Sequence, residues 1–236
     1  MISIIVPCYN EERNIHMLVE RFDGIKELLN INGFELILVD NGSQDKTSIE
    51  IDKQCEKYDY IKKVSIKKNI GYGYGILQGL YAGSGEWLGW IHADLQSPPE
   101  AFVEMVAKVK DYEKNSKLFF KGRRKNRPLL DTLFTIGMGV LESIFLRKKL
   151  WDINAQPTLI SRSLLKKMEN PPYDFSLDLY VYYLAKKLEY DVIRIPVKQK
   201  PRVAGKSSWN NGMKARLKLI KRTLVYSFEL KKRIGV

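Results

Sequence analysis

Short apolar runs alternate with amphipathic segments over the first hundred residues, and this alternation is what most constrains the fold. The runs have the length and β-branched content of buried strands, whereas the segments between them carry apolar residues at helical spacing. The expected strands are residues 2–7, 34–39, 61–66 and 87–91, and the expected helices are 11–29, 47–58 and a third ending at Ala82. Such alternation predicts the α/β class, with a mostly parallel central sheet flanked by helices.

The rest of the chain continues this pattern less regularly. Further helices are expected at residues 100–112, 129–146, 177–187 and 212–232, and further strands at 118–121 and 192–197. Basic loops are expected at residues 122–128 and 198–209. We therefore divide the chain into a main domain, residues 1–209, and a basic amphipathic C-terminal helix, residues 210–236.

Polar side chains follow three of the expected strands at the point where each strand ends. They are Tyr9, Asn10 and Glu11 after the first strand, Asp40 and Asn41 after the second, and His92 and Asp94 after the fourth. In an open parallel sheet, ligands bind beyond the carboxyl ends of the strands. The three polar strand ends therefore predict a binding site at one edge of the sheet.

Asp94 follows a buried strand and precedes the Pro98-Pro99 pair that ends it. A carboxylate in such a place suits Mg²⁺ or Mn²⁺, which take one or two carboxylates together with substrate phosphates and water. The alternative is that Asp94 has a purely structural role as an acidic residue in the turn after the strand. His92 is either a ligand, which would favour Mn²⁺, or a neighbour that contacts a phosphate or a sugar hydroxyl.

Positive charge is concentrated near the C-terminus. The net charge is +13, and residues 194–236 hold thirteen Lys or Arg and one acid, so the preceding residues are close to neutral. The expected terminal helix has one apolar stripe, formed by Met213, Leu217, Ile220, Leu224 and Phe228. This pattern favours an anionic membrane surface as a partner, although a helix docked on its own domain or on another subunit has the same pattern.

The sequence also indicates the cellular location of the protein. Cys8 and Cys55 are the two cysteines, with neither metal-site spacing nor a disulfide framework, which favours a reducing cytoplasmic setting. The first residues lack the pattern of a signal peptide, and no uncharged window is long enough to span a bilayer. We expect a cytoplasmic protein that is peripheral at the cytosolic face of a membrane.

Four further motifs occur in order along the chain: IIVPCYNEE at 4–12, VDNGSQDKT at 39–47, NIG at 69–71 and HADLQ at 92–96. Together they resemble family 2 glycosyltransferases of the GT-A fold, and most closely the dolichol- or polyprenyl-phosphate sugar transferase branch. The likeness runs from Ile2 to Trp209 and is specific because four separate motifs agree.

The resemblance implies inverting transfer from a nucleotide-diphospho-sugar donor with Mg²⁺ or Mn²⁺. Nucleotide contacts are expected from Pro7, Tyr9, Glu11, Asp40, Asn41, Asn69, Gly71, His92 and Ala93. Asp94 would be the metal ligand of the family's Asp-x-Asp motif, with His92 as a less certain second ligand. The phosphates and the acceptor would be bound by Gln96, Arg123, Asp152 and a closing loop that carries Arg202, Lys206 and Ser207.

Asp178 stands roughly where the family carries its candidate base, so the expected catalytic residues are Asp94, Asp178 and Arg202. An acid at the start of a helix is equally explained by the helix dipole. A base is needed for a hydroxyl acceptor and hardly at all for a phosphate anion. The acceptor is therefore a polyprenyl phosphate or, as the alternative, a sugar hydroxyl of a glycan or lipid-linked oligosaccharide.

The chain departs from the family pattern in three places. His92 takes the first acidic position of Asp-x-Asp, Asn41 replaces a second acid, and residues 152–157 differ from the usual acceptor segment. A catalytically weak nucleotide-sugar-binding module is therefore a rival interpretation. No nucleic-acid partner is expected, because aromatic residues are sparse in the basic tail and nucleic-acid-binding motifs are absent. The sequence leaves the sugar, the nucleotide base and the oligomeric state open.

Overall fold

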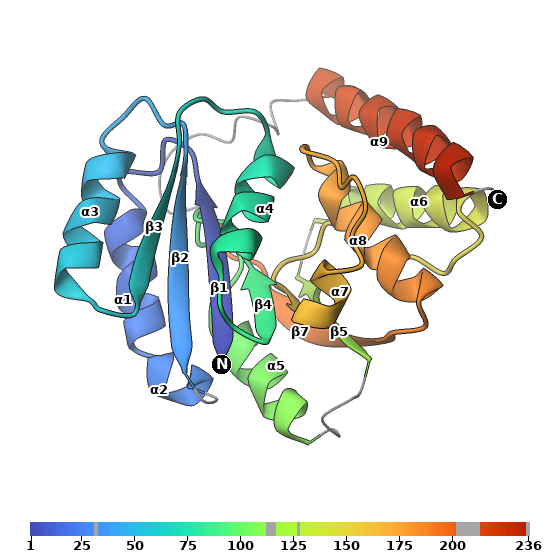
Figure 1. The fold of residues 1–236 in the computed structure, drawn as a ribbon. Coiled ribbons are helices and arrows are strands. Elements are labelled where there is room, and N and C mark those ends of the chain that lie inside the picture. The colour runs from blue at the N-terminus through green and yellow to red at the C-terminus, as the bar shows by residue number, and fades with distance from the viewer. Residues whose placement is uncertain (31–32, 112–116, 127, 202–212, 235–236) are drawn as a thin grey trace.

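The computed structural model describes residues 1–30, 33–111, 117–126, 128–201 and 213–234 (Figure 1). The strands are β1 (Ile2–Cys8), β2 (Phe34–Asn41), β3 (Ile61–Ile66), β4 (Trp87–Trp90), β5 (Leu118–Lys125), β6 (Thr158–Ser161) and β7 (Asp191–Lys198). The helices are α1 (Ile15–Asp23), α2 (Lys26–Leu29), α3 (Thr47–Lys57), α4 (Tyr72–Ala82), α5 (Ala101–Lys110), α6 (Leu129–Phe145), α7 (Arg162–Leu165), α8 (Ser176–Lys187) and α9 (Met213–Ile234).

The strands form one seven-stranded sheet in the order β3-β2-β1-β4-β6-β5-β7. β1 pairs in parallel with β2 and β4, β2 pairs in parallel with β3, and β5 pairs in parallel with β7. β6 runs antiparallel to both of its neighbours. The predicted α/β class and the mostly parallel sheet are therefore confirmed.

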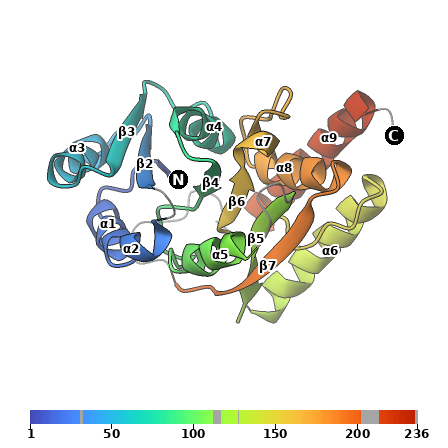
Figure 2. The same ribbon diagram turned by 60° about the horizontal axis from the view of Figure 1, so that its bottom comes forward.

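Helices cover both faces of the sheet (Figure 2). Side chains alternate along the central strands, because successive residues of a strand point to opposite faces. On β2, Leu36 and Leu38 pack on the core under α1, α3 and α5, whereas Ile37 and Val39 pack on the core under α4 and α8. Two hydrophobic cores thus hold the central strands in a fixed register.

The boundaries differ from the predictions in two instructive places. The expected helix 11–29 begins only at Ile15 and is interrupted between α1 and α2, so Glu11 lies in a loop. The expected basic loop 122–128 is wrong over its first half, because β5 continues to Lys125 and pairs with β7. Its pairing partner β7 is far away in the sequence, so local composition gave no sign of the longer strand.

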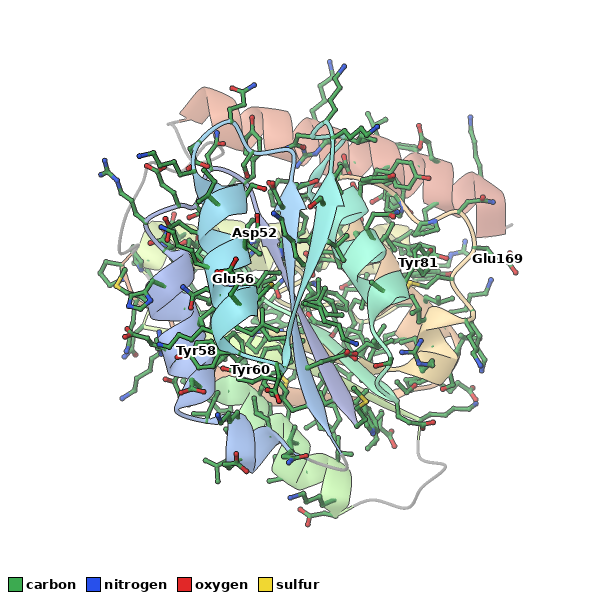
Figure 3. All side chains as sticks on the ribbon, turned by 60° about the vertical axis from the view of Figure 1, so that its left-hand side comes forward. Asp52, Glu56, Tyr58, Tyr60, Tyr81 and Glu169 are labelled. Carbon is green, nitrogen blue, oxygen red and sulfur yellow. The ribbon has the colours of Figure 1, made fainter. Side chains whose placement is uncertain are left out.

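The β3 edge of the sheet carries lysines that find acidic partners. Lys63 is 2.7 Å from Asp52 of α3, and Lys62 is 2.6 Å from the buried Glu35 of β2. Figure 3 shows this face, with Asp52 on α3 and with Tyr58 and Tyr60 between α3 and β3. Charged side chains on an edge strand discourage pairing with another chain.

The C-terminal helix α9 packs against α6 and α8 (Figure 1). Tyr226, Ser227 and Leu230 are buried, and the buried Glu142 of α6 accepts a hydrogen bond from Ser227. Phe228, expected on the apolar face, is largely exposed, and its ring packs edge-on against Phe145 of α6. Among the described residues, no helix is both long and apolar enough to cross a membrane. The expected division near residue 209 lies outside the described residues.

We expect Gly79→Ala to destabilise the fold by about 1–3 kcal/mol, the usual cost of overpacking a core. A Cβ at Gly79 of α4 would lie 2.4 Å from Cγ2 of Ile5 and 2.9 Å from Cγ2 of Val39. Urea unfolding measures the effect. Gly137→Ala on α6 is the matched control, since a Cβ there meets nothing within 4 Å. The control should gain up to about 1 kcal/mol from helix propensity, and equal losses in both variants would contradict this packing.

Candidate functional site

The carboxyl ends of β1, β2 and β4 meet at one edge of the sheet, as the sequence predicted. Cys8 lies opposite Asp40 and Ile5 lies opposite Trp90 in the parallel register. The backbone N–H of Ile91 continues the β4 pairing by donating to the Ile5 carbonyl at 3.1 Å. The segments 7–11, 40–43 and 91–96 therefore leave the sheet side by side.

The loops after β1 and β2 are tied together by hydrogen bonds. The Glu11 N–H donates to Oγ1 of Thr47 at 2.8 Å, and the Gln44 N–H donates to Oδ1 of Asn10 at 2.8 Å. Pro7 and Glu11 are half-buried, whereas Tyr9 remains exposed beside them. This arrangement holds the predicted nucleotide-binding residues of the two loops together and leaves the Tyr9 ring free for a ligand.

Asp40 and Asn41 have structural contacts of their own. Oδ1 of Asp40 accepts from the Ser43 N–H at 2.9 Å, which forms the turn after β2. Nδ2 of Asn41 donates to the Gly71 carbonyl at 3.1 Å, and its Oδ1 is buried without a hydrogen bond in the described part of the chain. Asn41 thus attaches the loop before α4 to the end of β2.

Asn69 and Gly71 lie in that loop, at the same edge. A Cβ at Gly42 would be 2.5 Å from the backbone nitrogen of Asn69, so the two loops are in close contact. Gly42 has a φ of +73°, a left-handed conformation that favours glycine. Asn69 is exposed, which leaves its side chain open to a ligand.

His92 and Asp94 follow β4, with the buried Ala93 between them. Asp94 is half-buried, and its Oδ1 accepts from the Gln96 N–H at 3.1 Å. The Gln96 carbonyl in turn accepts from the Lys200 N–H at 2.9 Å. The segment that leads from β7 toward Arg202 therefore runs beside the Asp94 loop.

The side chains at this edge fit a divalent cation that is completed by its substrate. Among the described residues, no group of three or more His, Cys, Asp or Glu side chains is placed to hold a metal by itself. Asp94 offers one carboxylate and His92 one imidazole, and a hard cation accepts such a set when diphosphate oxygens and water supply the rest. The donor set therefore fits Mg²⁺ or Mn²⁺ bound together with a diphosphate.

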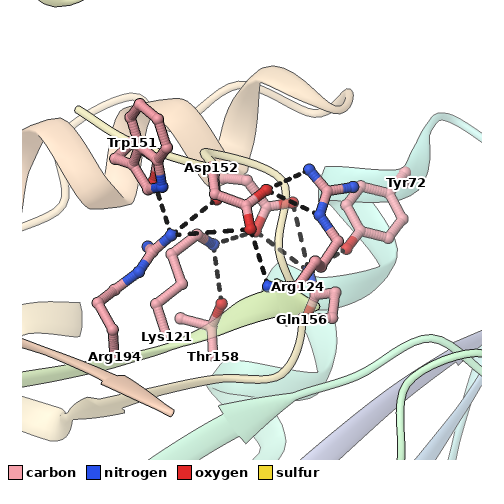
Figure 4. Close-up of polar contacts among 9 residues, drawn as sticks. Tyr72, Lys121, Arg124, Trp151, Asp152, Gln156, Thr158 and Arg194 are labelled. Atoms are coloured by element: carbon pink, nitrogen blue, oxygen red, sulfur yellow. Dashed lines mark hydrogen bonds and ion pairs between the residues drawn. The ribbon is translucent and has the colours of Figure 1, made fainter. Parts of the chain in front are cut away.

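Asp178 is buried and belongs to a polar network. Figure 4 shows its neighbours Lys121, Gln156 and Thr158. Its carboxylate is 3.3 Å from Nζ of Lys121, which also donates to Oγ1 of Thr158 at 3.1 Å. Nε2 of Gln156 donates to the same carboxylate at 3.2 Å. Burial lowers the pKa of Lys121 to about 8, although the neighbouring Asp178 opposes this shift.

Asp152 holds a cluster of arginines beside this network (Figure 4). It accepts from Nε of Arg124 at 2.7 Å and from the Arg124 N–H at 3.0 Å. Nη2 of Arg194 lies 4.0 Å from Oδ2 of Asp152. Burial raises the pKa of Asp152, but the two arginines and the hydrogen bonds outweigh it and hold this pKa below its usual value. Two guanidinium groups around one carboxylate leave an excess of positive charge.

Arg123 precedes this cluster on β5 and is exposed. Arg202, Lys206 and Ser207 lie outside the described residues, so their expected role in closing over the phosphates stays a prediction. Asp152, expected on the acceptor side, does lie in the same cluster as the basic residues of β5.

Four residues of the site were missed by sequence reasoning: Tyr72, Lys121, Gln156 and Arg194. For Lys121 and Arg194 a signal exists, because each is a cation within an apolar strand and must find a buried partner. Tyr72 and Gln156 stand beside predicted motifs without any local pattern that marks them. Their role depends on neighbours that are distant in the sequence.

A family model described as "Glycosyl transferase family 2" matches residues 3–168. Among curated relatives, the chain is 37% identical over 110 residues to the uncharacterized glycosyltransferase YkcC of Bacillus subtilis, covering 46% of this chain and 33% of that protein. It is 29% identical over 150 residues to the dolichol-phosphate mannosyltransferase of Pyrococcus furiosus, covering 62% and 42%. The chain thus spans less than half the length of these relatives.

Solved structures share the fold at low sequence identity. Glucosyl-3-phosphoglycerate synthase from Mycobacterium tuberculosis, in complex with Mn²⁺, UDP and glucosyl-3-phosphoglycerate, matches with a TM-score of 0.71 at 18% identity, over 100% of this chain and 80% of that one. The mannosyltransferase PcManGT from Pyrobaculum calidifontis, in complex with GDP-Man and Mn²⁺, matches with 0.66 at 18% identity, over 98% and 64%. These likenesses confirm the predicted GT-A fold. Since the family model extends over more than half of the sequence, from β1 to just beyond α7, the chain belongs to glycosyl transferase family 2.

Proposed function

We propose that this chain transfers a sugar, with inversion, from a nucleotide-diphospho-sugar to a polyprenyl phosphate at the cytosolic face of a membrane. Family membership supports the reaction class. The names of two relatives support the acceptor: a dolichol-phosphate mannosyltransferase, and an undecaprenyl-phosphate 4-deoxy-4-formamido-L-arabinose transferase that is 34% identical over 109 residues. The single observation that carries the proposal is that Asp178 is buried and that its carboxylate already accepts hydrogen bonds from Lys121 and Gln156.

On the donor side, the loops after β1 and β2 would hold the nucleoside, with the exposed Tyr9 ring and the Asp40 carboxylate at the joined strand ends. Asp94 would hold the cation beside the diphosphate, with the imidazole of His92 as a second ligand or as a neighbour of the phosphates. When bound, that cation offsets the negative charge that develops on the departing nucleotide. Arg202 and Lys206 would add positive charge from the segment that begins beside Gln96.

On the acceptor side, Asp178 is only 2% exposed, and its oxygens accept from Lys121 and Gln156. A carboxylate occupied in this way is not open to a proton from a bound hydroxyl group. A phosphate monoester is already an anion near neutral pH and needs no general base to attack the anomeric carbon. The buried state of Asp178 therefore favours a phosphate over a sugar hydroxyl as the acceptor.

The arginine cluster favours the same acceptor. Arg124 and Arg194 share Asp152, and Nε and Nη1 of Arg194 are buried without hydrogen-bond partners in the described part of the chain. The exposed Arg123, which precedes Arg124 on β5, adds a third guanidinium group. Arginine forks match phosphate oxygens in geometry and charge, so a phosphate could be held where these residues gather.

A membrane location is favoured by the outer face of α6. Its exposed apolar side chains recur at helical spacing and are Leu129, Leu133, Val140, Leu141 and Ile144. Basic residues 147–149 follow the helix directly. An exposed apolar stripe next to basic residues matches the interface of an anionic bilayer. Side chains 213–220 of α9 lie outside the described part, so α6 carries this argument in place of the predicted α9 stripe.

We expect the protein to glycosylate a polyprenyl phosphate in the presence of Mg²⁺ or Mn²⁺ and a cognate nucleotide sugar. The donor is found first by a thermal-shift screen, because a ligand that binds only the folded state raises its melting temperature. The product should have the anomeric configuration opposite to that of the donor, as read by NMR. Asp94→Asn should lower kcat by about a hundredfold, the usual loss for one group that stabilises developing charge.

Asp111→Asn, at an exposed carboxyl group just after α5, is the matched control and should retain full activity. Transfer onto sugar hydroxyls with polyprenyl phosphate left unused would overturn the proposed acceptor. Binding of a donor without turnover, and without any effect of Asp94→Asn, would instead support the weak binding module.

We expect Ile144→Gln to weaken binding to vesicles that contain anionic lipid by about tenfold, because a buried isoleucine side chain contributes about 1.5 kcal/mol or more. Vesicle sedimentation at fixed salt measures the change. Ile49→Gln on α3 is the control, since Ile49 is 55% exposed and α3 lies at the opposite end of the molecule from α6 (Figure 1). An equal loss in both variants, or no binding by the unaltered protein, would rule out the α6 face.

A further inference from the structure

Tyr72 begins α4, and its ring lies between two other rings. On one side it stacks on Phe175, with ring centres 4.4 Å apart and planes inclined by 9°. On the other side it stacks on the imidazole of His92, at 5.0 Å and 23°. Parallel rings at these separations contribute more than their buried area alone. The imidazole beside Asp94 is thus supported by an aromatic face.

The stack continues to the C-terminal helix. The guanidinium group of Arg222 in α9 lies 5.1 Å from the centre of the Phe175 ring, and its Nε is 3.2 Å from Oδ2 of Asp174. We call Arg222, Phe175, Tyr72 and His92 the ring column. Its members come from α9, from the residue before α8, from α4 and from the end of β4, so the column joins four separate parts of the fold.

The backbone around the column leaves Tyr72 little freedom. The Tyr74 N–H donates to the Tyr173 carbonyl at 3.0 Å. A Cβ at Gly71 would lie 2.2 Å from that same carbonyl oxygen, and one at Gly73 would lie 2.6 Å from the Asp174 carbonyl oxygen. The two glycines flanking Tyr72 therefore allow the segment before α8 to press directly on the start of α4.

The hydroxyl end of Tyr72 reaches the acceptor side of the site (Figure 4). It accepts from Nε2 of Gln156 at 3.0 Å, and it interacts with the carboxylate of Asp178. Burial of the hydroxyl, followed by the nearby negative charge of Asp178, raises the pKa of Tyr72 well above its ordinary value. The phenol therefore stays neutral and acts as a fixed hydrogen-bonding link.

We propose that Tyr72 is a positioning residue, which fixes the imidazole of His92 beside the donor diphosphate and ties that strand end to Asp178 on the acceptor side. A flat imidazole can stack on the face of the Tyr72 ring, which an aspartate carboxylate in its place could not do. Tyr72 and His92 are thus matched to each other. The proposal rests on the proposed function for the identity of donor and acceptor, but the ring column itself does not.

Two histidines in the chain make the column directly observable by NMR. His92 carries the Tyr72 ring on its face, whereas His16 lies on the exposed side of α1 next to Glu20. Spectra recorded at about pH 8.5, above the ordinary histidine pKa of about 6.5, exclude differences in protonation. We expect the ring protons of His92 to be shifted upfield by the tyrosine ring current, and those of His16 to have ordinary shifts.

Three variants then separate positioning from folding. Tyr72→Leu should abolish the upfield shift of His92 and leave His16 unchanged, while Tyr72→Phe keeps the ring and should keep the shift. Tyr81→Leu is the matched control, because Tyr81 is on the same helix with 57% of its surface exposed (Figure 3). It should alter neither histidine. Circular dichroism and thermal unfolding, compared with the unaltered protein, report whether each variant remains folded.

In the transfer assay, Tyr72→Leu should lower kcat by about 10- to 100-fold, the usual loss when a group that orients a site residue is removed. Tyr72→Phe should recover part of that loss, and Tyr81→Leu should show none. An unshifted His92 in the unaltered protein, or a His92 signal unaffected by Tyr72→Leu, would overturn the proposal. If no transfer occurs at all, the proposed function fails, but the NMR result still shows whether Tyr72 positions the imidazole of His92.

Discussion

The parallel pairing of β1 with both β2 and β4 is the constraint on which the rest of this structure depends. It brings the segments after three strands to one edge of the sheet, where the backbone itself fixes their spacing. The cores on both faces make a shift in register costly, because a slip of one residue would turn every buried side chain of β2 to the wrong face. The backbone pairing therefore brings Asp40, His92 and Asp94 to the same edge of the sheet, and no direct contact among their side chains is needed for this.

Charge placement divides the site into two parts. At the donor edge, Asp94 is half-buried, so it can serve an incoming cation. On the proposed acceptor side, Asp178 is paired with the fully buried Lys121, and Asp152 holds two arginines. Removing one partner from such a buried pair costs far more than the pair contributes. The acceptor side is therefore a preset arrangement with positive charge in excess, which suits an anion.

The features that the sequence predicted are those carried by local patterns. The alternation of strands and helices predicted the class of fold, and the polar residues after apolar runs predicted which strand ends lie at one edge of the sheet. The extent of β5 was missed because Arg123 to Lys125 look like a loop unless their pairing with β7 is known. The ring column was missed for the same reason, since Tyr72, Phe175 and Arg222 are separated by long stretches of chain. Lys121 and Arg194, as cations inside apolar strands, were detectable signs of buried partners.

A crystal structure with a nucleoside diphosphate and Mn²⁺ would show directly whether Asp94 holds the cation beside the diphosphate. An anomalous difference map locates the metal without ambiguity. We expect one manganese ion with a carboxylate oxygen of Asp94 at about 2.2 Å, a typical metal–oxygen distance, and with diphosphate oxygens completing its coordination. The nucleoside should lie over the ends of β1 and β2. A metal and nucleotide found elsewhere, with the Asp94 carboxylate turned away from both, would contradict it.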